Sequence, residues 1–159
     1  MGNVSTILDA ARAAGAPVIF NRIVVYPGAA GGTNAPISNM LGSESFKLGS
    51  WGAEIVDELK PADSDIVLDR NRMSAFNGSG LDFILRNLGV SKVVVVGGWT
   101  NMAVEHTVRD AADHGFEVSI VSDATSSINA EWHEAALSFA LLNIATITDT
   151  KSVVEAPNA

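Results

Sequence analysis

Apolar residues recur along the chain in two alternating patterns, one with the spacing of a helix and the other with the continuous run of a buried strand. The first helical stripe consists of Val4, Ile7, Leu8 and Ala11. Its i, i+3, i+4, i+7 spacing predicts a helix, which we expect to end near Gly15. The segment 17–25 that follows is β-branched and apolar enough for a strand buried on both faces.

The same alternation continues to the end of the chain. Further helices are predicted at 53–59, 81–88, 102–114 and around 132–140. Further strands are predicted at 65–69, 92–97, 117–122 and 145–148. We therefore expect an α/β protein with a three-layer, mostly parallel sheet flanked by helices. No linker or repeat divides the chain, so residues 1–159 are expected to form a single domain.

One long segment, 26–50, interrupts this alternation with glycines, prolines and small polar residues. A loop of this length in a compact domain is typical of a functional lid or of an oligomer contact. A phosphate-binding loop is the weaker interpretation, because no Gly-Lys-Ser/Thr follows the glycines. The segment favours self-association into a homo-oligomer.

Composition excludes several classes of function. The net charge of −8, with an isoelectric point near 4.7, argues against a nucleic acid partner. No apolar run approaches the roughly 20 residues of a membrane span, and no signal peptide is present, so we expect a soluble, cytoplasmic protein without a membrane partner. The chain has no cysteine, which excludes disulfides, thiolate metal sites and thiol catalysis.

The segment 93–110, VVVVGGWTNMAVEHTVRD, carries the most specific motif. It resembles the strand, turn and helix that hold the nucleophile in isochorismatase-like cysteine hydrolases, where the pattern reads Gly-x-x-Thr-x-x-Cys-Val-x-x-Thr. The matching residues here are Gly97, Thr100, Val104 and Thr107. Ala103 stands at the nucleophile position. Segments 8–20, 68–85, 115–124 and 133–137 resemble other parts of the family in order.

The resemblance also implies which catalytic groups are missing. Amidases of the family use an Asp at the end of the first strand, a Lys and the Cys nucleophile. Here Ala103 is inert and Arg70 occupies the Lys position, where it keeps the charge but cannot shuttle a proton. Residues 1–4 run directly into the first predicted helix, so the usual first strand, which lies in the middle of the sheet, is expected to be absent. Natural degeneration or a gene fragment explains this combination better than one engineered substitution, and we expect five parallel strands.

The resemblance implies that the pocket still contains groups that can bind a ligand. It places Trp99 and Thr100 at a strained turn, often with a cis peptide, and it aims the backbone N–H groups of Met102 and Ala103 at a ligand carbonyl. Arg70 and Arg72 would add cations. Phe76 and Tyr26 are expected to form walls. Such a pocket suits a small amide or carboxylate, with no cofactor.

Structural alternatives exist for several of these residues. Arg70 could instead pair with Asp69 or Asp123, and His133 is expected to have a structural role. His106 and His114 lack partners at metal-ligand spacing, so no metal is expected.

Two classes of function remain open. One is a silent or altered hydrolase that binds a small metabolite, and the other is an interaction or structural subunit that completes its sheet with another chain. A third, less favoured hypothesis is hydrolysis by water held on Asp69, Asp123 or Glu105.

Overall fold

Five strands form two parallel groups in the computed structural model, which describes residues 1–28, 32, 34–41 and 44–156. The first group pairs β1 (Ile19–Ile23) with β2 (Ile66–Arg70). The second group has the order β3 (Lys92–Gly98), β4 (Glu117–Ser126) and β5 (Thr146–Thr148). Every pair within the two groups is parallel, which confirms the expected number and direction of strands in the described residues.

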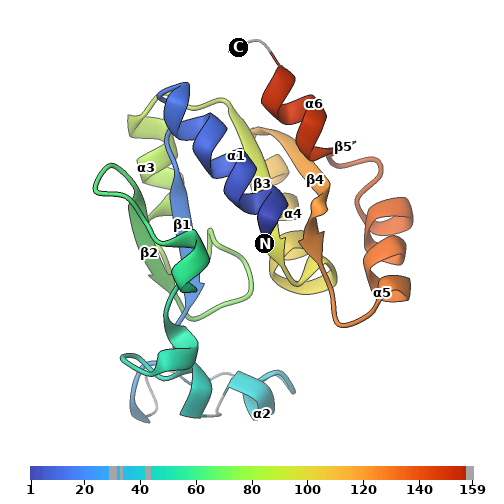
Figure 1. Cartoon of the computed structure of the whole chain (residues 1–159). Coiled ribbons are helices and arrows are strands. Elements are labelled where there is room, and N and C mark those ends of the chain that lie inside the picture. Colours follow the sequence, from blue (N-terminus) through green and yellow to red (C-terminus); the bar gives the residue numbers. More distant parts are fainter. Residues whose placement is uncertain (29–31, 33, 42–43, 157–159) are drawn as a thin grey trace.

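Helices cover both faces of the strands, as the alternation predicts. One face packs against α3 (Leu81–Asn87), α4 (Glu105–Asp113) and the π-helix η6 (Ala136–Ala140), which continues α5 (Ala130–Ala135). The other face packs against α1 (Gly2–Ala13) and α6 (Thr150–Glu155), and Figure 1 shows α1 in front of the strands. The three-layer α/β architecture is therefore confirmed.

The larger hydrophobic core lies on the α3 and α4 face. Val108, Ile120 and Leu141 are fully buried there, and burial of each such side chain contributes roughly 1.5–3 kcal/mol. Ile19 from β1 and Val95 from β3 both pack against this cluster. The two strand groups are thus held by one core although no ladder of hydrogen bonds joins β1 to β3.

The strands β1 and β3 are less buried than their apolar sequences predict. All five residues of β1 are only half-buried, and Val94 of β3 exposes 48% of its surface. Among the strands that the structure describes, β1 and β3 each have a hydrogen-bonded neighbour on one side only. The expectation of a strand buried on both faces is wrong for β1, because none of its five residues is fully covered by the layers packed on its faces.

The predicted helix at 53–59 is also wrong. The chain instead forms two 3-10 helices, η3 (Trp51–Ala53) and η4 (Asp57–Leu59), separated by an extended Glu54. Val56 exposes 44% of its surface and residues 57–59 contain no buried side chain, so this segment does not bury the apolar face that stabilises a short helix.

The helices of the carboxyl-terminal half also differ from their predictions. The predicted helix at 102–114 begins as a π-helix, η5 (Thr100–Val104), and α6 was not predicted. In the helix predicted around 132–140, the two aromatic residues Trp132 and Phe139 are 46% and 84% exposed. The small Ala136 is buried as the apolar pattern predicts, and Leu137 is buried beside it. The helix is present, but its aromatic residues do not face the core.

The long segment 26–50 contains short elements at its far end. They are α2 (Ser38–Leu41) and the 3-10 helix η2 (Glu44–Phe46), and Lys47 bridges to Val25. The expected lid or oligomer contact falls partly on residues 29–31, 33 and 42–43, which lie outside the described residues. Among the helices described, none is long and apolar enough to cross a membrane.

Candidate functional site

The turn after β3 has the backbone that the motif predicts. Gly97 has a φ of +115°, a conformation that favours glycine, and the Gly98–Trp99 peptide bond is cis. The carbonyl of Trp99 accepts hydrogen bonds from the N–H groups of Met102, at 3.0 Å, and Val104, at 3.2 Å. The N–H of Met102 is therefore already bonded within the turn, which corrects the expectation that it is free for a ligand.

Thr100 is fully buried at this turn and is tied to a distant helix. Its Oγ1 lies 2.8 Å from Nδ1 of His133 on α5, and the two atoms share a hydrogen bond. Because Thr100 has no exposed surface, this bond positions the turn against α5 and leaves Thr100 no direct access to solvent. The contact supports the structural role expected of His133.

Arg70, the last residue of β2, is a buried cation with few partners. It is 6% exposed, and its Nη1 donates to the carbonyl of Arg72. Its Nε is one of two buried side-chain polar atoms that have no hydrogen-bond partner among the described residues. Burial lowers the pKa of Arg70 to about 10, because desolvation disfavours the charged form. The group is still protonated at neutral pH.

The carboxylates that were expected to neutralise Arg70 are bonded elsewhere. Asp69 accepts from Nε of Arg22 at 2.5 Å. Asp123 accepts from the N–H and the hydroxyl of Thr150, at 2.9 and 2.8 Å. Within the described part of the chain, no carboxylate forms an ion pair with Arg70, so the structural alternative for this residue is wrong.

Hydrogen bonds link the segment after Arg70 to the turn that carries Ala103. The N–H of Ala75 donates to Oγ1 of Thr107 at 3.0 Å, and that hydroxyl donates to the carbonyl of Ala103 at 2.7 Å. Ala75 and Val104 also belong to one buried cluster. The carboxyl ends of β2 and β3 are thus joined through Thr107, at the edge of the sheet where open α/β proteins place ligands.

Other predicted residues lie elsewhere or have other partners. The guanidinium of Arg72 donates to the carbonyls of Asn71, at 2.8 Å, and Gly32, at 3.3 Å. The ring of Phe76 packs 5.0 Å from His114, at the end of α4 opposite to Ala103. Trp99 and Tyr26 are half-buried. The structure does not bring Phe76 to the turn.

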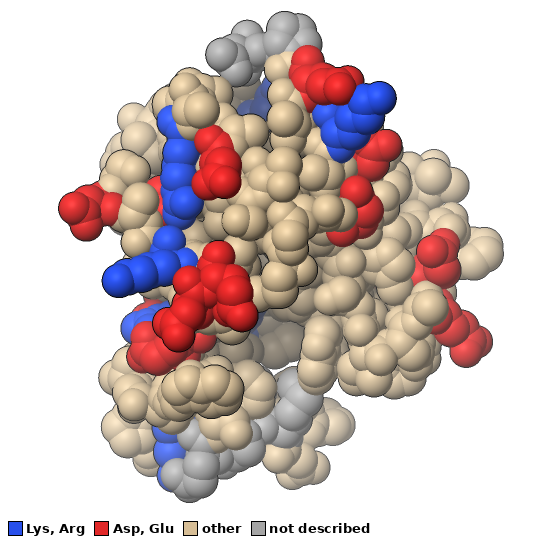
Figure 2. All heavy atoms as spheres, viewed as in Figure 1, with Lys and Arg blue, Asp and Glu red and all other residues tan. Residues whose placement is uncertain are grey.

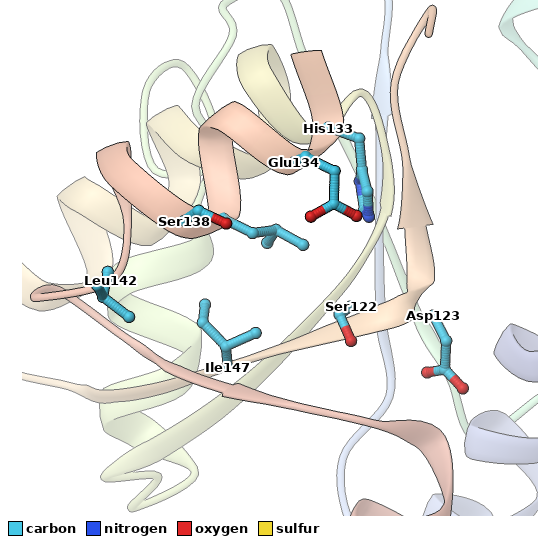
Figure 3. Close-up of a pocket in the computed structure, with 8 residues that line it drawn as sticks. Ser122, Asp123, His133, Glu134, Ser138, Leu142 and Ile147 are labelled. Atoms are coloured by element: carbon cyan, nitrogen blue, oxygen red, sulfur yellow. The ribbon is translucent and has the colours of Figure 1, made fainter. Parts of the chain in front are cut away.

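A separate cavity of about 500 Å³ lies between the helices α5 and η6 and the strands β4 and β5. In Figure 3 His133 and Glu134 extend from the helix toward Ser122 and Asp123 of β4. None of the predicted binding residues lines this cavity, and Asp123 and Ser122 already bond to the segment around Thr150. We therefore place the candidate site at Arg70.

The three carboxylates that were considered for water activation all form hydrogen bonds or ion pairs within the protein. Glu105 pairs with Arg109 at 3.0 Å on the same helix, and Asp69 and Asp123 have the partners named above. The described residues contain no group of three or more His, Cys, Asp or Glu residues that could hold a metal. Figure 2 shows acidic and basic side chains interleaved on the visible face, without a basic patch that would attract a polyanion.

Asn21 is the polar residue that the sequence analysis missed. Its Oδ1 is the other buried atom that lacks a hydrogen-bond partner among the described residues. Asn21 lies on β1, opposite Leu68 in the parallel register. A polar residue in the middle of the apolar run PVIFNRIVV was the available signal.

Comparison with known proteins agrees with this geometry. The isochorismatase domain matches residues 1–152. A ureidoacrylate amidohydrolase of Pseudomonas savastanoi pv. phaseolicola is 35% identical over 158 residues, and the match covers 91% of this chain but only 63% of that protein. An isochorismatase family protein of Desulfovibrio vulgaris is 27% identical with a TM-score of 0.87, covering 96% of this chain and 83% of that one. An N-carbamoylsarcosine amidase of Thermoplasma acidophilum is 28% identical with a TM-score of 0.79, covering 99% and 84%. The cis turn, the parallel strands and these matches together show that the chain belongs to the isochorismatase domain family.

Proposed function

We propose that the chain binds a small amide or carboxylate at the carboxyl ends of β2 and β3. The observation that carries the proposal is Arg70, a buried guanidinium without a carboxylate partner among the described residues. An unpaired buried charge is costly, and the oxygen of a ligand is the kind of partner that would offset this cost. Two relatives are named as an amidohydrolase and an amidase, which favours an amide or its carboxylate product as the ligand class.

We further propose that this site does not cleave its ligand by thiol chemistry. A methyl group at Ala103 has no nucleophilic atom, and a guanidinium at Arg70 retains its proton at neutral pH. One oxyanion-hole donor contributes only about 3–4 kcal/mol, which cannot replace a nucleophile. Binding without turnover is the expected behaviour of such a site.

The binding test uses propionate and propionamide as probes, followed by amide chemical shifts in an NMR titration. Arg70→Met should weaken binding of both probes at least about tenfold, the loss expected for one charge-assisted hydrogen bond. Arg86→Met is the matched control, because Arg86 is an exposed residue of α3 that pairs with Asp82. Equal affinities of the native protein and Arg70→Met would contradict the proposal.

The catalytic test measures amide release with and without an alkylating agent. The native chain and Ala103→Cys should both be inactive, because a thiol without a base or a lysine nearby stays mostly protonated. Ala103→Cys combined with Arg70→Lys and a supplied first strand should recover alkylation-sensitive activity. Robust turnover by the native chain would refute the silent-site proposal and indicate water activated by a carboxylate.

A second candidate function is that of a subunit that completes its sheet with another chain, including a second copy of itself. The supporting observation is that β1 and β3 share a core without pairing, with Val94 48% exposed. Unpaired strand edges can accept an added strand. If so, light scattering should give a mass above 16.6 kDa, and Val94→Lys should return it to the monomer value. A monomeric native protein at all concentrations would exclude self-association.

A further inference from the structure

Two buried polar atoms in the described residues have no hydrogen-bond partner, and they come from neighbouring strands. They are Oδ1 of Asn21 on β1 and Nε of Arg70 on β2. One is an acceptor and the other a donor, yet they are not bonded to each other. Buried polar groups in folded proteins are nearly always paired, so two such atoms on adjacent strands call for a common explanation.

The strand register places both side chains on the same face. Asn21 is opposite Leu68, and Arg70 is opposite Ile23, so the two residues are diagonal neighbours. Ile19 and Leu68 pack against the larger core, and side chains two positions along a strand point the same way. Asn21 and Arg70 therefore continue this apolar row toward the carboxyl ends of the strands, with Cα atoms about 8 Å apart by ideal strand spacing.

Asn21 lies on a strand whose second edge has no paired strand among the described residues. β1 has β2 as its only ladder partner in the described residues, so the other edge of β1 is not closed by a strand. The side chain of Asn21 is half-buried, while its Oδ1 is the buried atom. A small molecule that reaches Arg70 along this edge would pass Asn21.

We propose that Asn21 is a ligand-binding residue that acts together with Arg70 and selects ligands with an N–H group beside a carbonyl oxygen. The ligand oxygen accepts from Nε of Arg70, and the ligand N–H donates to Oδ1 of Asn21. A primary carboxamide satisfies both atoms. A carboxylate satisfies only Arg70 and brings its second oxygen against the oxygen of Asn21. The inference rests on the proposed ligand role of Arg70 and makes Asn21 the residue that distinguishes amide from acid.

The experiment combines stability and binding, because a purely structural asparagine and a ligand-binding one differ in both. Asn21→Leu replaces an amide whose buried oxygen has no partner among the described residues with an apolar group of similar size, so the melting temperature without ligand should stay the same or rise. The same variant should bind propionamide about tenfold more weakly and leave propionate binding within twofold, since one neutral hydrogen bond is removed. Asn87→Leu, at an exposed residue of α3, is the matched control and should change neither affinity.

The outcomes separate this inference from the proposed function. If Arg70→Met weakens binding of both probes but Asn21→Leu does not affect propionamide, the anion role of Arg70 stands and the role of Asn21 is overturned. If neither variant affects either probe, both proposals fail. A large fall in the melting temperature of Asn21→Leu would show that Asn21 is satisfied within the fold, by water or main chain, and would also overturn the inference.

Discussion

Two buried charged residues, Asp65 just before β2 and Arg70 at its end, differ in their hydrogen-bond partners. At the amino end, the side chain of Asp65 is 2% exposed and accepts from Nη2 of Arg12 at 2.5 Å and from the N–H of Ala62 at 2.9 Å. At the carboxyl end, Arg70 is 6% exposed, and the one hydrogen bond of its guanidinium within the described residues goes to a main-chain carbonyl. One charge is neutralised within the fold, whereas the other has no carboxylate among the described residues.

Both pKa values are lowered, but the shift favours the charged form of the acid Asp65 and disfavours the charged form of the base Arg70. The hydrogen bond from Arg12 lowers the pKa of Asp65, which favours its charged form. Burial alone lowers the pKa of Arg70 to about 10, which disfavours its charged form. A charge that the fold stabilises contributes to stability, and a charge that the fold leaves unpaired is a candidate for ligand binding. We infer that the amino end of β2 serves stability and the carboxyl end serves function.

The largest effect on stability is expected at the amino end. Asp65→Asn removes the carboxylate and leaves Arg12 without its main partner, so the free energy of unfolding should fall by about 2–3 kcal/mol. Urea denaturation followed by circular dichroism measures this change. Asp63→Asn, two residues away and exposed, should stay within about 0.5 kcal/mol. If the two variants lose the same free energy of unfolding, Asp65 would have no special role in stability at the amino end of β2.

Acid should reveal the same interaction in the native protein. Because the pKa of folded Asp65 is lowered, its contribution is fully present above the unfolded value of about 4 and is lost as the pH falls through the lower folded value. The stability difference between the native protein and Asp65→Asn should therefore shrink below about pH 4. A difference that stays constant from pH 7 to pH 3 would argue against this ion pair.

At the carboxyl end, we expect a substitution of the charged residue to leave the free energy of unfolding unchanged or to raise it. Arg70→Met replaces an unpaired buried charge with an apolar chain, so the free energy of unfolding should stay unchanged or rise by about 1 kcal/mol in the absence of ligand. The same denaturation measurement applies. A loss of more than about 2 kcal/mol would mean that the fold does depend on the guanidinium, and the comparison between the two ends would fail.

The smallest effect is expected on the opposite face of the same carboxyl end. Asp69 pairs with Arg22, but the two side chains are 28% and 24% exposed. Solvent screening reduces the value of such a pair, so Asp69→Asn should cost about 1 kcal/mol or less. Its binding of propionate and propionamide should not change. Loss of probe binding in Asp69→Asn would show that the site is not confined to the face of Arg70.

Particular elements show how far sequence patterns predict this fold. The helical stripe that ends near Gly15 and the apolar strand at 92–97 are found from the sequence, because helical spacing and a run of β-branched residues each favour one kind of element. The segment 53–59 was misassigned, since periodicity over seven residues does not distinguish a helix from two separate 3-10 turns. The direction in which Trp132 and Phe139 face depended on how α5 and η6 pack and was not fixed by their spacing.

The candidate site was predictable only in part. Its motif residues around Trp99 and Thr100 share a local pattern, so the turn could be found before the structure was known. Asn21 could not be assigned a role in the same way, because its significance comes from the strand that pairs with β1. The engaged N–H of Met102 was also invisible in the sequence, since it depends on the path of the π-helix.

The sequence by itself determined the alternation of most helices and strands, the lack of cysteine in this chain and the membership in a family with a parallel sheet. These properties follow from residue type and local spacing, which do not need contacts between distant segments. Only the tertiary structure decided which charges are paired. Asp65 meets Arg12 from α1 across the fold, while Arg70 meets no carboxylate among the described residues, although both are charged residues at the ends of one strand. Burial and hydrogen bonding depend on groups that the chain brings together only when it folds.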